Sequence, residues 1–139
     1  MQSKQINKTN YLIRIQRGEK IIETLKTFCK EKKIEGGFFY GLGAVDWVEL
    51  AHYDVVKQKY SSLSFEKAYE VSNLTGSIGV EQDLIIHAHM TLADNQMQAL
   101  AGHLIDARVS GTAEIYLQAL PKLNKKFDKE TGLKLFDFS

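Results

Sequence analysis

Apolar and polar residues alternate over most of the chain, which is the pattern of strands that bury one face. In residues 11–16, Tyr11, Ile13 and Ile15 fall on one side, because successive side chains of an extended backbone point to opposite faces. Further strand-like runs are predicted at 38–45 continuing into 47–53, and at 60–65, 68–78, 84–90 and 112–120. Gly76 and Gly79 are expected to punctuate the 68–78 run, and Pro121, the only proline, ends the last one.

A single stretch has helical spacing instead. A helix is expected to open at Gly18-Glu19 and to run to about Lys33, with Glu19 in the first turn, where the helix dipole favours an acid. Its apolar stripe consists of Ile21, Ile22, Leu25, Phe28 and Cys29. One helix among many short strands predicts an α+β fold with a mostly antiparallel central sheet.

Two segments are predicted to be irregular. Residues 1–10 are interpreted as a loose polar lead-in, and residues 93–102 as a loop or one short helical turn. The Gly-Leu-Gly-Ala run at 41–44 lacks the third glycine of a dinucleotide loop and the Lys-Ser/Thr ending of a triphosphate loop. We therefore interpret its glycines as a kink or bulge within a strand.

Length, charge and cysteine content restrict the class of protein. With 139 residues, 44% of them hydrophobic, the chain suits one domain, 1–139, better than two. Its 17 acidic and 18 basic residues give a net charge of +1, a smaller basic surplus than proteins that mainly grip nucleic-acid phosphates carry.

Cys29 is the only cysteine, so an internal disulfide is excluded and a reducing, cytoplasmic location is expected. Its place on the apolar stripe favours a buried thiol over a catalytic one. No segment has the pattern of a signal peptide or the length of a membrane span, so no membrane partner is expected.

Three of the four histidines cluster between residues 87 and 103. His87 and His89 share one face of a predicted strand with Cα atoms roughly 7 Å apart, at ~3.3 Å per residue. Both rings can therefore lean onto one ion, and His103, beside Gly102 in the following loop, would supply a third ligand and leave one position open. The alternatives are rings hydrogen-bonded to backbone and a pH-sensitive patch.

Several short motifs follow one another along residues 11–120. They are Arg17-Gly18-Glu19, Gly43-Ala44-Val45, EVSNLTGSI at 70–78, His87-Ala88-His89, Gly102-His103-Leu104 and Thr112-Ala113-Glu114. In this order they resemble the plant-and-prokaryote-conserved (PPC) domain in its stand-alone prokaryotic form. The chain departs from the family at Ala101, where a glycine is usual. The resemblance implies a domain core at about 11–120 followed by a C-terminal extension at 121–139.

The resemblance further implies a homotrimer and a metal, zinc in most prokaryotic members, held near a subunit boundary by His87, His89 and His103. Imidazole ligands also suit other divalent transition metals. Plant relatives grip DNA through AT-hooks that precede the domain, and this chain contains no Arg-Gly-Arg-Pro core.

Three functions remain open from the sequence. The first is a trimeric metal-binding module with a DNA-associated or regulatory role, supported by Arg14, Arg17, Lys122, Lys125 and Lys126. The second is a zinc-dependent hydrolase or lyase acting on a small molecule at the open three-histidine site, with Glu49, Asp94 or Glu114 as a proton shuttle. In the third, the metal or the bare histidines brace the trimer and a protein partner docks elsewhere.

Overall fold

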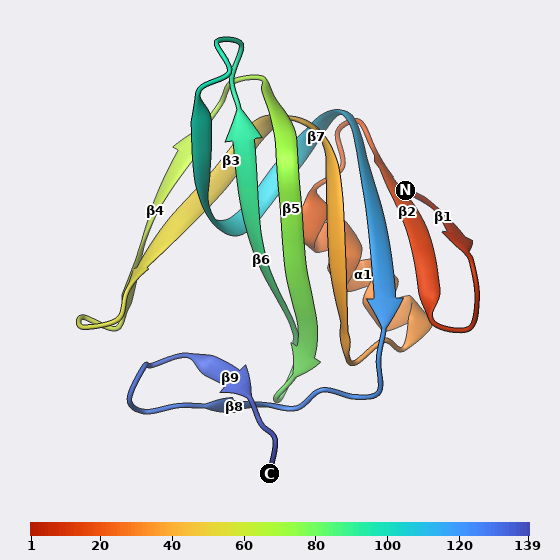
Figure 1. Cartoon of the computed structure of the whole chain (residues 1–139), viewed down its shortest axis with the longest axis vertical. Coiled ribbons are helices and arrows are strands. Elements are labelled where there is room, and N and C mark those ends of the chain that lie inside the picture. Colours follow the sequence, from red (N-terminus) through yellow and green to blue (C-terminus); the bar gives the residue numbers. More distant parts are fainter.

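The computed structural model describes residues 1–139 and contains one helix and nine strands (Figure 1). In chain order these are β1 (Gln2–Gln5), β2 (Asn10–Gln16), α1 (Ile21–Lys32), β3 (Gly37–Asp54), β4 (Lys59–Phe65), β5 (Tyr69–Val80), β6 (Leu84–Ala93), β7 (Ala99–Ala119), β8 (Lys125–Phe127) and β9 (Lys134–Phe136). The helix, α1, lacks both the length and the apolar character that crossing a bilayer requires.

Seven strands form one antiparallel sheet in the order β1-β2-β7-β6-β5-β3-β4, while β8 and β9 form a separate hairpin. The two longest strands, β3 and β7, also pair with each other. Hydrogen bonding therefore runs from β3 through β5, β6 and β7 back to β3. A sheet that closes on itself has an inner face on which side chains pack. The predicted α+β fold, with one helix and a mostly antiparallel sheet, is confirmed.

Helix α1 buries the predicted stripe against the sheet, on β6 and β7, and lies behind the strands in Figure 1. Phe28 meets Tyr11 of β2 edge to face, with ring centroids 5.4 Å apart. Cys29 is fully buried in this layer, and burial raises the pKa of its thiol to about 12. The interpretation of Cys29 as a buried, unreactive thiol is consistent with both findings.

The start of α1 differs from the prediction, because the helix begins at Ile21 rather than at Gly18-Glu19. Glu19 precedes the helix and instead accepts a hydrogen bond from the Gln16 N–H at 2.7 Å. The side chain that accepts a hydrogen bond from the helix N-terminus comes from β7, where Asp106 accepts a 2.9 Å hydrogen bond from the Ile22 N–H. A cap supplied from a distant strand leaves no local sequence signal.

Gly41 and Gly43 produce the predicted irregularity within β3. The register between β3 and β5 shifts between these two residues. A Cβ at Gly43 would stand 2.1 Å from the carbonyl oxygen of Thr112, so only glycine lets β3 approach β7 at this point. The bulge interpretation is confirmed.

Three segments are more regular than predicted. Residues 2–5 of the lead-in form β1, paired with β2. Gly76 and Gly79 lie inside β5 rather than at breaks. Only residues 94–98 connect β6 to β7, and β7 begins at Ala99. The Asp94 carboxylate closes this turn by accepting from the N–H groups of Gln96 and Gln98, at 2.9 and 3.0 Å.

The chain after β7 crosses the end of the sheet and forms the β8–β9 hairpin, seen at the bottom of Figure 1. The Val80 N–H at the end of β5 donates to the carbonyl of Leu123 at 2.8 Å. Gln58, in the β3–β4 turn, donates to the carbonyls of Lys129 and Glu130, both at 3.1 Å. Main-chain carbonyls before and after β8 therefore attach the hairpin to the end of β5 and to the β3–β4 turn.

Candidate metal centre

The three clustered histidines lie on neighbouring strands, and strand register fixes their positions. His87 and His89 are two residues apart on β6, so their side chains project from the same face. His103 pairs directly with His89 across the β6–β7 ladder. The prediction that His103 lies in a loop is wrong, because β7 already includes it. All three rings are therefore carried by the central sheet.

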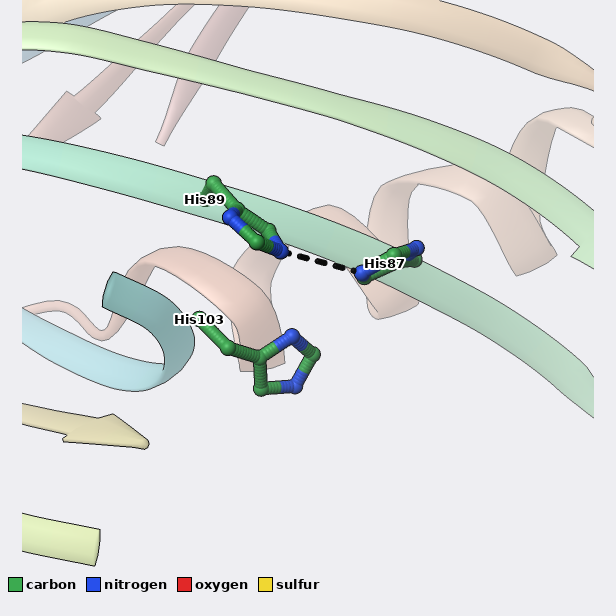
Figure 2. A group of neighbouring side chains, drawn as sticks. All are labelled: His87, His89 and His103. Atoms are coloured by element: carbon green, nitrogen blue, oxygen red, sulfur yellow. Dashed lines mark hydrogen bonds between the residues drawn. The ribbon is translucent and has the colours of Figure 1, made fainter. Parts of the chain in front are cut away.

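Figure 2 shows the three rings converging from β6 and β7. The Nε2 atoms of His87 and His89 are 3.3 Å apart. One nitrogen from each ring lies within 4.8 Å of the corresponding nitrogens of the other two. Two nitrogens bound at roughly 2.0–2.1 Å to one tetrahedral zinc ion would stand ~3.3 Å apart. The His87–His89 separation matches this value.

Backbone hydrogen bonds do not occupy these rings. The one hydrogen bond that any of the three makes joins His87 to His89. The Nδ1 atom of His103 is buried and has no partner. A buried polar atom without a partner is costly, and coordination to a cation would satisfy it.

The electrostatic surroundings keep two of the rings neutral at pH 7. Burial, followed by the neighbouring His87 and His89, lowers the pKa of His103 to about 4. Burial, Lys125 and then His89 also lower the pKa of His87. A metal ligand must be the neutral imidazole, so the three rings fit a divalent transition metal that accepts nitrogen ligands.

A pocket of about 740 Å³ opens beside the rings. Besides the three histidines, its walls include His52, Tyr53, Tyr60, Ser77, Lys125 and residues 132–136 of the hairpin. Gly102 also borders it, and a Cβ there would stand 3.1 Å from the carbonyl oxygen of Ala51. Gly102 thus allows β7 to approach β3 closely next to His103.

Lys125 of β8 lines the same pocket and is unusually buried for a lysine, at 7% exposure. Its stem packs over Gly79 of β5, where a Cβ would come within 3.0 Å of Lys125 Cε. Its Nζ lies 4.6 Å from the centre of the Phe136 ring and has no hydrogen-bond or ion-pair partner within the chain. The expectation that Lys125 adds to a basic surface is therefore wrong.

Two tyrosines connect His103 to the hairpin. The rings of Tyr60 and His103 are 5.0 Å apart, and those of Tyr53 and Tyr60 are 4.6 Å apart. The Tyr53 hydroxyl donates to the carbonyl of Thr131 at 2.8 Å. Burial and the neighbouring Tyr53 raise the pKa of Tyr60, so its phenol stays protonated at neutral pH. The hairpin is thus positioned relative to the histidines through β3 and β4.

None of the three proposed proton shuttles reaches the pocket, whose lining includes no carboxylate. Glu49 accepts a 2.7 Å hydrogen bond from Ser62, and Asp94 pairs with Lys67 at 3.0 Å in the β6–β7 turn. Glu114 borders a different pocket, together with Tyr40 and Leu42. Glu49, Asp94 and Glu114 are therefore unsuited to the role predicted for them.

Sequence reasoning missed His52, Tyr60 and Lys125, which join the histidines only through long-range pairing. Tyr60 and His52 belong to the β3–β4 ladder, and His103 pairs with Ala51 of β3. That register carries His52 to the pocket beside His103. The isolated position of His52 in the sequence gave no signal of this proximity.

Comparison with known proteins supports the resemblance seen in the motifs. The sequence profile of the Plants and Prokaryotes Conserved (PCC) domain matches residues 2–121. No curated protein matches the chain.

Several solved structures share the fold with a sequence identity of 25% or more. A proposed DNA-binding protein from Bacteroides thetaiotaomicron is 30% identical, with a TM-score of 0.94 over 99% of this chain and 96% of that one. A plant- and prokaryote-conserved protein from Pyrococcus horikoshii is 29% identical, with a TM-score of 0.85 over 92% and 90%. A metal-containing protein from Archaeoglobus fulgidus is 25% identical, with a TM-score of 0.86 over 92% of each chain. The profile match and these likenesses show that the chain belongs to the plant-and-prokaryote-conserved domain family.

Proposed function

We propose that this chain is a metal-binding PPC-domain protein in which His87, His89 and His103 hold a divalent transition metal, zinc in the first instance. We further propose that it assembles as a homotrimer and has a DNA-associated or regulatory role. The observation that carries the metal proposal is the convergence of three ring nitrogens within 4.8 Å. The Archaeoglobus relative, which is described as a metal-containing protein, supports it.

Three imidazoles bound to zinc leave a position for an outside ligand, and such an ion acts as a Lewis acid there. The chain's own contribution is to fix the three rings on adjacent strands and to keep His87 and His103 neutral. Coordination through the buried Nδ1 of His103, which has no partner within the chain, would satisfy that atom.

Elemental analysis of protein purified without an affinity tag tests the metal, and sedimentation of the same sample tests the assembly. We expect one zinc per chain and a mass three times 15.8 kDa. Protein that contains no transition metal, and takes up none when zinc is supplied, would contradict the metal proposal. A monomer at micromolar concentration would contradict the trimer without affecting the metal.

The DNA-associated role rests on the family and on relatives from Bacteroides and Ralstonia that are described as proposed DNA-binding proteins. Of the basic residues considered, four are exposed: Arg14, Arg17, Lys122 and Lys126. Threefold repetition of the chain would multiply the number of these charges on one assembly. Lys125 does not contribute because it is buried.

Binding to a duplex of mixed sequence, measured across a series of salt concentrations, tests this role. If phosphates are neutralised, the logarithm of the affinity falls linearly with the logarithm of salt concentration, at ~0.9 per phosphate contact. An Arg17→Gln/Lys126→Gln variant should have a shallower slope than wild type. No binding at 50 mM salt would rule out a direct DNA contact.

A small-molecule enzyme is the second candidate, and the pocket of about 740 Å³ beside the histidines favours it. Its size lies within the range of small-ligand sites. A screen for metal-dependent hydrolysis or lyase activity, with His87→Ala as the inactive control and the trimer intact, tests this alternative. Turnover that survives His87→Ala would place the activity elsewhere.

A further inference from the structure

The geometry of the histidine pocket points to a ligand class: a small organic carboxylate with an apolar body, its carboxylate held between the Lys125 ammonium and the three-histidine centre. This inference rests on the proposed metal function for one of the two contacts. It assigns to Lys125 a role that neither the fold nor the core requires.

Lys125 is a cation without an internal counter-charge. Only 7% of the residue is exposed, yet no carboxylate and no carbonyl of the chain accepts a hydrogen bond from its ammonium. The Phe136 ring at 4.6 Å offers only its π face. The buried part of Lys125 is its stem, because its Nζ is not among the fully buried polar atoms that lack a partner and is therefore open to the pocket. An ammonium carries three donors, and none of the three has an acceptor within the chain. An anion in the pocket would supply the missing acceptors.

The absence of a side chain at Gly79 leaves space for the stem of Lys125. Gly79 of β5 has no side chain, and a Cβ there would stand 3.0 Å from Cε and 3.1 Å from Cγ of Lys125. The stem therefore lies flat on β5, beside the Ser77 that faces His87 across the β5–β6 ladder. Lys134, the other lysine of the pocket, differs because Glu81 already pairs with it at 2.5 Å.

The other residues that line the pocket determine which non-carboxylate part of the ligand fits. Half of the lining residues are hydrophobic, among them Ile85, Ile86, Leu133 and Phe136. The lining contains no arginine, the residue best shaped to clasp phosphate or a dicarboxylate at two points. One unpaired ammonium with apolar walls suits a single carboxylate on an apolar group better than inorganic phosphate. The absence of any carboxylate from the lining also avoids repulsion of such a ligand.

Calorimetric titration of the zinc-loaded full chain with benzoate tests this assignment. Lys125→Met removes the ammonium while keeping a similar stem, and Lys126→Met is the matched control because Lys126 is exposed on the same strand. We expect at least tenfold weaker benzoate binding for Lys125→Met and less than a twofold change for Lys126→Met. Benzyl alcohol, which lacks the charge, should bind wild type at least tenfold more weakly than benzoate.

Equal benzoate affinity in wild type and Lys125→Met, equal affinity for benzyl alcohol, or tighter binding of inorganic phosphate would each overturn the assignment. Zinc content and circular dichroism of each variant exclude loss of the centre or of the fold as the cause. Repeating the titrations on zinc-free protein separates the two proposals. Lys125-dependent benzoate binding in a chain that takes up no zinc would support the anion pocket and reject the metal, whereas zinc uptake without benzoate binding would do the reverse.

Discussion

The histidines and Lys125 line one pocket from supports of very different kinds. The histidines stand on β6 and β7, which lie inside the seven-stranded sheet with a neighbouring strand on each side. Lys125 stands on β8, whose three residues pair only with the three residues of β9. The sheet gives its side chains a register that cannot slip without turning the apolar face outward, whereas the hairpin depends on a few contacts at its ends.

In the proposed site, this difference assigns metal binding to the sheet and ligand selection to the hairpin. The histidine rings are fixed by the pairing of β6 with β7, so their spacing stays the same when residues of the hairpin change. A short hairpin with few buried contacts opens at lower free energy than the sheet and tolerates substitution. Specificity set by the hairpin can therefore change while the geometry of the centre stays the same.

The largest expected effect comes from removing a ring of the centre. His103→Ala should lower zinc affinity by more than 100-fold, beyond the ~10–100-fold typical of outer-shell changes. His52→Ala is the matched control, because His52 lines the pocket but stands outside the cluster. Competition with a chromogenic chelator measures both. Similar losses for the two variants would mean that the ion is bound by the whole pocket rather than by the three rings.

The second effect is a pH dependence of the zinc-free protein. The folded state lowers the pKa of His103 to about 4, whereas the ordinary pKa of a histidine is 6.5. Between pH 6.5 and pH 4, His103 therefore binds a proton in the unfolded chain but not in the folded chain. Stability is therefore lost as pH falls from 6.5 towards 4, by up to about 1.4 kcal/mol per pH unit, and is unaffected above 7.

Urea unfolding at pH 7.0, 6.0 and 5.0 measures this dependence. His103→Asn lacks the titrating ring and should have a flatter profile over the same range. Parallel profiles for the two proteins would show that other groups, and not the centre, determine the loss.

Local patterns predicted part of this molecule because the residues involved are neighbours in the sequence. The alternation around His87 and His89 identified a shared face, since the strand period alone decides it. The stripe of α1 and the bulge at Gly41 and Gly43 were predictable for the same reason. Each depends on the backbone of one element.

Features that depend on pairing between distant segments were not predictable. The polar run before His103 predicts a loop, whereas Asp94 closes part of that run into a short turn and the pairing of β6 with β7 places His103 in a strand. The sequence predicts a surface charge at Lys125, because nothing nearby in the sequence indicates that Gly79 of β5 leaves space for its side chain.

A smaller effect is expected from a contact that joins the helix to the sheet. Asp106→Ala removes the acceptor of the Ile22 N–H and should lower the global free energy of unfolding by about 1 kcal/mol. The zinc content should not change, because Asp106 does not reach the centre. Asp83→Ala, at an exposed position, is the control for loss of an acid. An equal effect in the two variants would mean that the cap contributes no stability.

The smallest effect should appear in the hairpin alone. Tyr53→Phe removes the hydroxyl that donates to the carbonyl of Thr131 and leaves the ring packed against Tyr60. One hydrogen bond is worth ~0.5–1.5 kcal/mol, so amide exchange should accelerate about two- to tenfold in residues 128–136, with little change in β6 and β7. Tyr60→Phe is the control, because the Tyr60 hydroxyl makes no hydrogen bond within the chain. Acceleration that extends through β6 and β7 would show that hairpin and sheet open together, and the two supports would then be one unit.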